Sequence, residues 1–93
     1  MEISNCSALE KIPLNKNKLS GSIPREISNC INLASIDLSQ NEFRGPILVE
    51  ISFMSSLSYL NISRNQLSGT IPMEISRLGW LEEIDFSGNK FLV

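Results

Sequence analysis

The sequence predicts an α/β solenoid, a stack of similar coils in which each coil adds one short strand to a parallel sheet. Three observations predict it. An apolar frame recurs four times along the chain, a segment containing glycine recurs at the same period, and one asparagine stands at the same place in every copy. These asparagines are 24 residues apart, at Asn17, Asn41, Asn65 and Asn89. A fixed period of roughly 20–50 residues is the signature of coils that pack only against their neighbours.

The strand of each coil is predicted by apolar residues that stand eight, five and three positions before the asparagine. Apolar and polar residues alternate between the second and third of these columns, as expected for a short strand with one buried face. Strands that recur once per coil can only pair side by side in parallel. The three columns are Leu9, Leu33, Leu57 and Leu81; Ile12, Ile36, Leu60 and Ile84; and Leu14, Leu38, Ile62 and Phe86.

The asparagines lie where the chain turns away from this sheet. A side-chain amide carries two donors and an acceptor, so we expect a ladder of asparagines that bind the turn backbone, including that of the neighbouring coil. The simpler alternative is that asparagine only tolerates a turn. That alternative does not explain why the residue recurs in all four copies.

The second half of each coil predicts a short helical or 3-10 turn on the convex side. Residues 19–24 recur as 67–72, whereas the middle copy, 43–48, has its proline two positions earlier, at Pro46. The recurring glycine indicates a positive φ or a close approach between coils. Proline is expected at the first helical position, with a glutamate near the exposed amides. The positive end of each helix then offsets the repulsion within a column of like charges. This column is Glu2, Glu26, Glu50 and Glu74. The outer side of the core is predicted to contain Ile27, Ile51, Ile75, Cys30, Met54 and Leu78.

The chain is expected to be one domain, 1–93, without caps. It divides into a partial repeat 1–8, full repeats 9–32, 33–56 and 57–80, and a partial repeat 81–93. It starts and stops inside a repeat, which indicates a piece of something longer. Core residues at both ends are expected to be exposed, which predicts self-association of the isolated chain. The first residues lack the basic and apolar regions of a signal peptide. No apolar stretch is long enough to span a membrane.

Composition argues against several classes of function. The 8 basic and 10 acidic residues give a net charge of −2, and no basic run indicates a nucleic-acid partner. The chain has no histidine, which excludes catalytic triads and zinc sites that need one. No glycine motif for a nucleotide is present. We therefore expect no enzymatic activity, no cofactor and no metal.

These residues resemble the plant-type leucine-rich repeat, whose pattern is LxxLxLxxNxLSGxIPxxIxxL. Residues 57–80 match nearly every position, and the resemblance covers essentially the whole chain. It implies an ectodomain of a plant receptor-like kinase or receptor-like protein, outside the cell or at its surface. Such ectodomains are recognition scaffolds for a protein or peptide ligand or a co-receptor. Two alternatives stay open: a secreted polygalacturonase-inhibitor-like protein, and a structural spacer, or a truncated or engineered solenoid, with no ligand of its own. The second repeat departs from the pattern at Pro46 and Leu48, and Val93 stands where glycine is expected.

Cys6 and Cys30 are one period apart in a column of apolar residues. Adjacent coils bring such residues within disulfide range, but parallel side chains that point into one core disfavour a bridge. We therefore expect two unlinked, buried thiols. Two sequons, which begin at Asn5 and Asn61, are candidate N-glycosylation sites if the parent protein is secreted.

The positions that alternate with the buried columns predict the concave face. They are Lys11, Pro13, Asn15, Lys16, Ser35, Asp37, Ser39, Gln40, Tyr59, Asn61, Ser63, Arg64, Glu83, Asp85, Ser87 and Gly88. Five of them differ from the repeat pattern and are the candidate ligand-binding residues: Lys11, Lys16, Tyr59, Arg64 and Glu83. Tyrosine and arginine are enriched at binding hot spots. The alternative is an ordinary solvated sheet face.

Two further residues carry expectations. Trp80 could be a lateral contact residue or could cover the end of the core, and we favour the second. Pro13 falls within a predicted strand although it lacks a backbone donor, which indicates an edge strand or a locally unpaired position.

Overall fold

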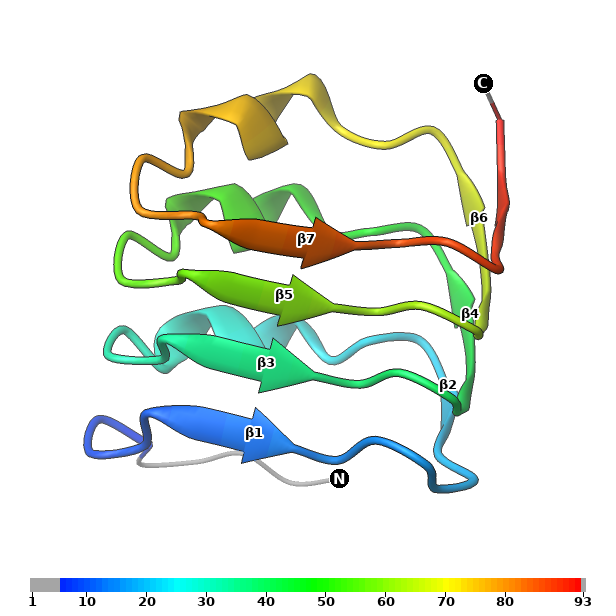
Figure 1. Ribbon diagram of the computed structural model, residues 1–93, viewed down its shortest axis with the longest axis horizontal. Coiled ribbons are helices and arrows are strands. Elements are labelled where there is room, and N and C mark those ends of the chain that lie inside the picture. Colours follow the sequence, from blue (N-terminus) through cyan, green and yellow to red (C-terminus); the bar gives the residue numbers. More distant parts are fainter. Residues whose placement is uncertain (1–5, 93) are drawn as a thin grey trace.

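Four stacked coils make up the structure, a computed structural model that describes residues 6–92 (Figure 1). Each coil contributes one strand to a parallel sheet, which we call the first sheet. Its strands, in spatial order, are β1 (Lys11–Pro13), β3 (Ser35–Asp37), β5 (Tyr59–Asn61) and β7 (Glu83–Asp85). The predicted solenoid and its parallel sheet are confirmed.

The register of the first sheet follows the sequence period. Ile36 pairs with Ile12 on one side and with Leu60 on the other, and Leu60 pairs in turn with Ile84. Coils of equal length therefore place each column of the sequence in one row across the sheet. Pro13 ends β1, which is the edge strand of the described sheet, as its missing N–H predicted.

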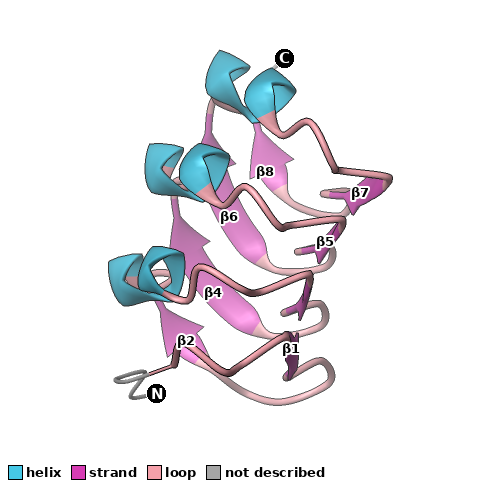
Figure 2. Ribbon diagram, turned by 90° about the vertical axis from the view of Figure 1, so that its left-hand side faces the viewer, coloured by secondary structure: helices cyan, strands magenta, loops and turns pink. Residues whose placement is uncertain are grey.

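A second parallel sheet, which the sequence did not predict, forms beside the first (Figure 2). Its segments are only two to four residues long, which is too short to show apolar alternation. Backbone bonds between coils hold it, such as the one from the Glu42 N–H to the Leu19 carbonyl at 2.7 Å. Gly21, Gly45 and Gly69 have φ of 81°, 85° and 78°, which explains the recurring glycine. The strands are β2 (Ser20–Gly21), β4 (Glu42–Gly45), β6 (Gln66–Gly69) and β8 (Lys90–Phe91).

Three 3-10 helices lie across the coils from the first sheet, as predicted (Figure 2). They are η1 (Arg25–Asn29), η2 (Val49–Phe53) and η3 (Met73–Arg77). The predicted place of the prolines was wrong by one residue. Pro24 and Pro72 precede their helices, with ψ of 132° in both. Leu48 has a ψ of 133° at the same position. The turn therefore needs an extended residue there and not proline itself, which explains why the second repeat tolerates leucine.

The core lies between the first sheet and the helices, and burial is highest in the middle coils. Leu33, Leu57 and Leu60 have no exposed surface, whereas Ile84 is only partly buried and Leu9 is 39% exposed. The outer columns pack as predicted, except that Ile75 is partly buried. The gradient arises because an internal coil has a neighbour on both sides and a terminal coil has one within the described chain.

Cys6 and Cys30 form a disulfide, so the expectation of two unlinked thiols was wrong. Their Cα atoms are 5.2 Å apart, within the range that a disulfide requires. Side chains of one column stack directly on one another in adjacent coils, and this brings the sulfur atoms together instead of keeping them parallel and apart. Cys30 is fully buried, as predicted, whereas Cys6 is only partly buried.

The glutamate column is only partly relieved by helix position. Glu26, Glu50 and Glu74 lie in the first turns of the helices, as expected, while Glu2 lies outside the described residues. The Arg25 Nε is 2.9 Å from the Glu50 carboxylate, so an ion pair links η1 to η2. An arginine from the neighbouring coil therefore also offsets the repulsion.

Candidate recognition surface on the first sheet

The side of the first sheet that faces away from the helices, here called the open face, is fixed at its carboxyl edge by asparagines. The Asn65 side chain donates to the carbonyls of Ile62 and Ser63 in its own coil and of Leu38 in the preceding coil, at 3.0–3.2 Å. Its carbonyl oxygen accepts the Phe43 N–H at 3.0 Å. Asn41 and Asn89 make the same four kinds of bond. Each of these amides joins two coils.

A second polar motif closes three of the strands. The Oδ1 of Asp37 accepts both the N–H and the hydroxyl of Ser39, at 3.0 and 2.6 Å. Asn61 with Ser63, and Asp85 with Ser87, repeat this pattern. Ser39 and Ser63 were predicted to be displayed, but they are only 4% and 6% exposed. Their hydroxyls turn towards the strand because a nearby acceptor satisfies them, so they are unavailable to a ligand.

A left-handed residue follows the strand in every coil. Lys16, Gln40 and Arg64 have φ of 58°, 55° and 55°, and Gly88 has a φ of 68°. Such values are uncommon for residues other than glycine. The lysine, glutamine and arginine are all exposed. The glycine in this column was the one signal in the sequence for this conformation.

Three of the five candidate residues stand in one row of the open face. Lys11 pairs with Ser35, Ser35 with Tyr59, and Tyr59 with Glu83. Lys11 and Glu83 are exposed, and Tyr59 is half-buried with its hydroxyl 3.2 Å from the Asn61 amide nitrogen. The row therefore runs from a cation through an aromatic ring to a carboxylate. Lys16 and Arg64 belong to the left-handed column, beyond the ends of the strands.

The fourth coil places one carboxylate and one glycine beside Arg64. Hydrogen bonds from the Ser87 hydroxyl, and then from its N–H, are the main reasons why the pKa of Asp85 is lowered, and the charge of Arg64 lowers it further. Gly88 lies against Arg64, since a Cβ added there would be 3.2 Å from the Arg64 Cγ. Arg64, Asp85 and Gly88 therefore meet at one corner of the open face.

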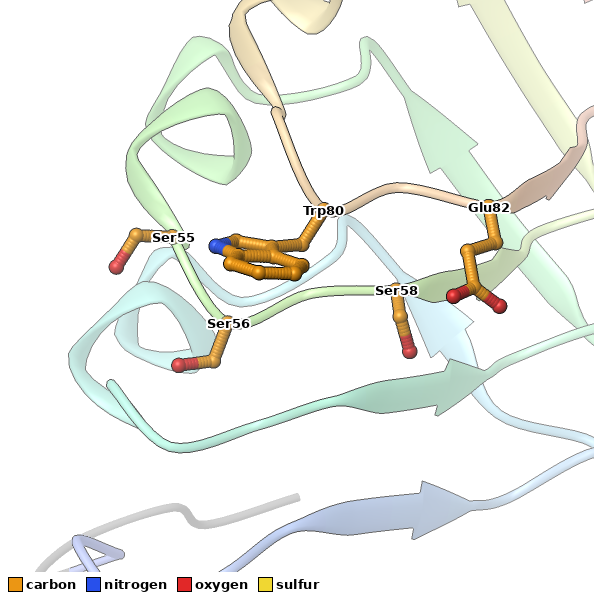
Figure 3. Close-up of a pocket in the computed structure, with 5 residues that line it drawn as sticks. All are labelled: Ser55, Ser56, Ser58, Trp80 and Glu82. Atoms are coloured by element: carbon orange, nitrogen blue, oxygen red, sulfur yellow. The ribbon is translucent and has the colours of Figure 1, made fainter.

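The prediction that Trp80 covers the end of the core was wrong, because its side chain is 73% exposed. The indole lies in the loop that leads into β7. It lines a hollow of about 290 Å³ together with residues of the loop that leads into β5 (Figure 3). The other lining residues are Ser55, Ser56, Ser58 and Glu82. Leu81, next to the tryptophan, takes the inward position and is partly buried, which leaves the indole outside.

The two sequons differ in what the structure describes. Asn61 is half-buried on β5 and its amide is hydrogen-bonded to Ser63 and Tyr59, whereas Asn5 lies outside the described residues. Within residues 6–92, no group of three or more histidine, cysteine, aspartate or glutamate side chains is arranged to hold a metal ion. The helices of this part of the chain are all too short to cross a membrane.

Comparison with known proteins identifies the family. The leucine-rich-repeat family model matches residues 8–30, 32–54 and 56–78. A search of curated proteins gave no significant match. Among solved structures, a chain of the BIR3–SERK2 complex from Arabidopsis thaliana is 38% identical with a TM-score of 0.87, over 90% of this chain and 45% of that chain.

Two further structures give the same result. The structure of PEPR1 with AtPEP1 contains a chain 37% identical, with a TM-score of 0.90, over 94% of this chain and 12% of that chain. The Arabidopsis receptor kinase HAESA, in complex with the peptide hormone IDA and the co-receptor SERK1, gives 38% identity and a TM-score of 0.80, over 83% of this chain and 13% of that chain. This chain thus spans less than half the length of these three relatives. It belongs to the leucine-rich-repeat family, and its plant-type repeats are similar to those of plant receptor ectodomains.

Proposed function

We propose that the chain is a recognition scaffold for a protein or peptide and that the open face of the first sheet carries its contacts. The observation that carries the proposal is the row across the four strands in which Lys11, Tyr59 and Glu83 stand, with Ser35 between Lys11 and Tyr59. A ligand that crosses the strands meets a cation, a ring and a carboxylate in turn. Lys16 and Arg64 extend this surface at the strand ends. Tyrosine and arginine in such positions are frequent hot spots.

The similar structures support this class of partner. HAESA was solved with a peptide hormone and a co-receptor, and another relative, RGFR1, is a peptide hormone receptor solved with RGF2. We infer a peptide ligand, a co-receptor or both for the protein to which this chain belongs. The single domain 1–93, as divided above, is part of the same proposal.

The proposed location is outside the cell. The Cys6–Cys30 disulfide supports it, because disulfides persist in oxidising compartments and are rare in the cytosol. Glycosylation at Asn5 and Asn61 belongs to this proposal. A glycan on Asn61 would stand beside Tyr59 on the open face and would restrict the ligand to the remaining part of the surface.

We infer that the chain acts by binding and not by catalysis. The sequence lacks histidine. The carboxylates of Asp37 and Asp85 each accept two hydrogen bonds from a neighbouring serine, which is a structural use. The lowered pKa of Asp85 keeps it ionised, whereas a general acid needs a raised one.

The test uses peptides selected from a random displayed library by binding to this chain. The double variant Tyr59→Ala/Arg64→Ala is expected to bind the selected peptides about tenfold more weakly, a loss of roughly 1.4 kcal/mol. The matched control is Phe53→Ala/Arg77→Ala, which removes an exposed ring and an exposed arginine from η2 and η3. The control is expected to bind like the unmodified chain in calorimetry.

Equal affinity of the two double variants for every selected peptide would contradict the proposal. That result would show that the selected peptides bind away from the open face. Circular dichroism of both variants checks that neither has lost the fold.

A further inference from the structure

The hollow beside Trp80 lies at the edge of the first sheet, where the chain enters β5 and β7 (Figure 3). Trp80 and Glu82 form one wall, and serines of the preceding coil form the other. All these residues lie in the two loops that lead into β5 and β7, within the described part of the chain. The hollow is separate from the row of Lys11, Tyr59 and Glu83, which lies on the strands themselves.

Backbone hydrogen bonds hold the two walls at a fixed distance. The N–H groups of Glu82 and Glu83 both donate to the Ser58 carbonyl, at 2.8 and 3.2 Å. Leu57, which is fully buried, and Leu81, which is partly buried, anchor the two loops in the core. The hollow is therefore preorganised, which lowers the cost of binding a ligand there.

The chemistry of the walls is unequal. The Trp80 indole extends along the third coil towards Ser55 and Ser56, while the Glu82 carboxylate stands near the other end (Figure 3). Within residues 6–92, no salt bridge or hydrogen bond engages this carboxylate. The hollow thus offers an apolar platform at one end and a negative charge without a partner at the other.

The same loop in the other coils lacks this combination. The residues at the positions of Trp80 and Glu82 are Ala8 and Glu10 in the first coil, Asn32 and Ala34 in the second, and Ser56 and Ser58 in the third. Asn32 donates instead to the Ser7 carbonyl of the preceding coil, which is a structural use of the position. Only the fourth coil joins an aromatic ring to a carboxylate.

We propose that this hollow binds an arginine or lysine side chain of a partner polypeptide. The methylene stem lies on the indole, and the charged head reaches Glu82. A cation near an indole gains electrostatic attraction, and the planar guanidinium stacks better than an ammonium, so arginine is preferred. Glu83, the next residue and the first of β7, adds a second carboxylate beside Glu82 in the chain. The proposal rests on the recognition function, because it names one side chain of the ligand.

Trp80 is the single tryptophan of the chain, so its fluorescence reports directly on the hollow. The probe is the peptide acetyl-Gly-Arg-Gly-amide, and the matched probe replaces arginine with citrulline, which has the same shape without the charge. The arginine peptide is expected to change the fluorescence saturably, with a Kd of about millimolar. The citrulline peptide should bind about fivefold more weakly or worse.

Two variants complete the test. Glu82→Gln is expected to weaken binding of the arginine peptide about fivefold, whereas Glu10→Gln, at the same position of the first coil, leaves it unchanged. Equal binding of arginine and citrulline peptides, an unaffected Glu82→Gln variant, or no saturable signal would each overturn the proposal.

The outcome is separable from that of the proposed function. Tyr59→Ala/Arg64→Ala leaves the walls of the hollow intact and should still bind the arginine probe. If the probe does not bind but this variant loses its selected peptides, the hollow proposal alone fails. If the probe binds and the variant keeps those peptides, the open-face proposal alone fails.

Discussion

At the scale of single residues, one asparagine side chain satisfies several backbone groups at once. Asn65 is 7% exposed and satisfies three carbonyls and one N–H from two coils. Asn17 is exposed and, among residues 6–92, its side chain bonds only to Leu14 and Asn15 in its own coil. Asparagine at this position therefore contributes less to the free energy of unfolding in the first coil than in the third. A buried polar group that loses its partner costs about 1–3 kcal/mol.

Replacement of Asn65 by alanine is expected to lower the free energy of unfolding by about 3 kcal/mol, because the buried Phe43 N–H and Leu38 carbonyl lose their partner. Asn17→Ala, the matched control, should cost less than about 1 kcal/mol. Urea denaturation followed by circular dichroism measures both. Similar losses in the two variants would show that the amides do not act by joining coils.

At the scale of elements, short pieces are stable because each pairs with its copy in the next coil. Strands of two to four residues would not persist alone, yet β4 and β6 pair through inter-coil bonds. The first coil is tied in addition by the Cys6–Cys30 disulfide, which spans 24 residues of sequence. This bond attaches the segment before β1, which pairs with no strand of the described chain, to the residue that follows η1.

Reduction of the Cys6–Cys30 disulfide is expected to lower the free energy of unfolding by about 3 kcal/mol, since the unfolded chain regains the entropy of an open loop. Thermal unfolding with and without dithiothreitol measures the change. The double variant Cys6→Ala/Cys30→Ala is the control, and its midpoint should not respond to the reductant. An unchanged midpoint for the reduced parent chain would contradict the expected contribution.

At the scale of the whole molecule, burial decreases towards both ends of the stack. Leu9 is 39% exposed and Leu92 is 68% exposed, whereas Leu33, Leu57 and Leu60 in the middle of the stack have no exposed surface. Terminal repeats of a solenoid need a polar outer face to stay soluble. The chain as an isolated molecule presents apolar surface at its ends instead.

The isolated chain is therefore expected to self-associate through these ends, which light scattering after size-exclusion chromatography would detect as mass above 10.4 kDa. Leu9→Lys/Leu92→Glu should shift the distribution towards monomer. Met73→Lys, which changes a side chain that is 88% exposed on η3, is the control and should have no effect. A monomer at all concentrations would contradict the expectation.

The sequence alone determined the period, and with it the fold. Equal spacing of Asn17, Asn41, Asn65 and Asn89 fixes the strand register, because coils of one length must align column by column. The columns also identified the row of candidate contact residues on the open face, including Tyr59. These features depend only on which positions are apolar and how far apart they stand.

The tertiary structure decided what lies between coils. A period does not show whether Cys6 and Cys30 touch, which way the Ser39 hydroxyl turns, or that segments such as β4 pair through their backbone. Trp80 is outside the core because Leu81 takes the inward place. Each of these outcomes depends on distances and hydrogen bonds in the folded chain. The aligned sequence repeats do not contain that information.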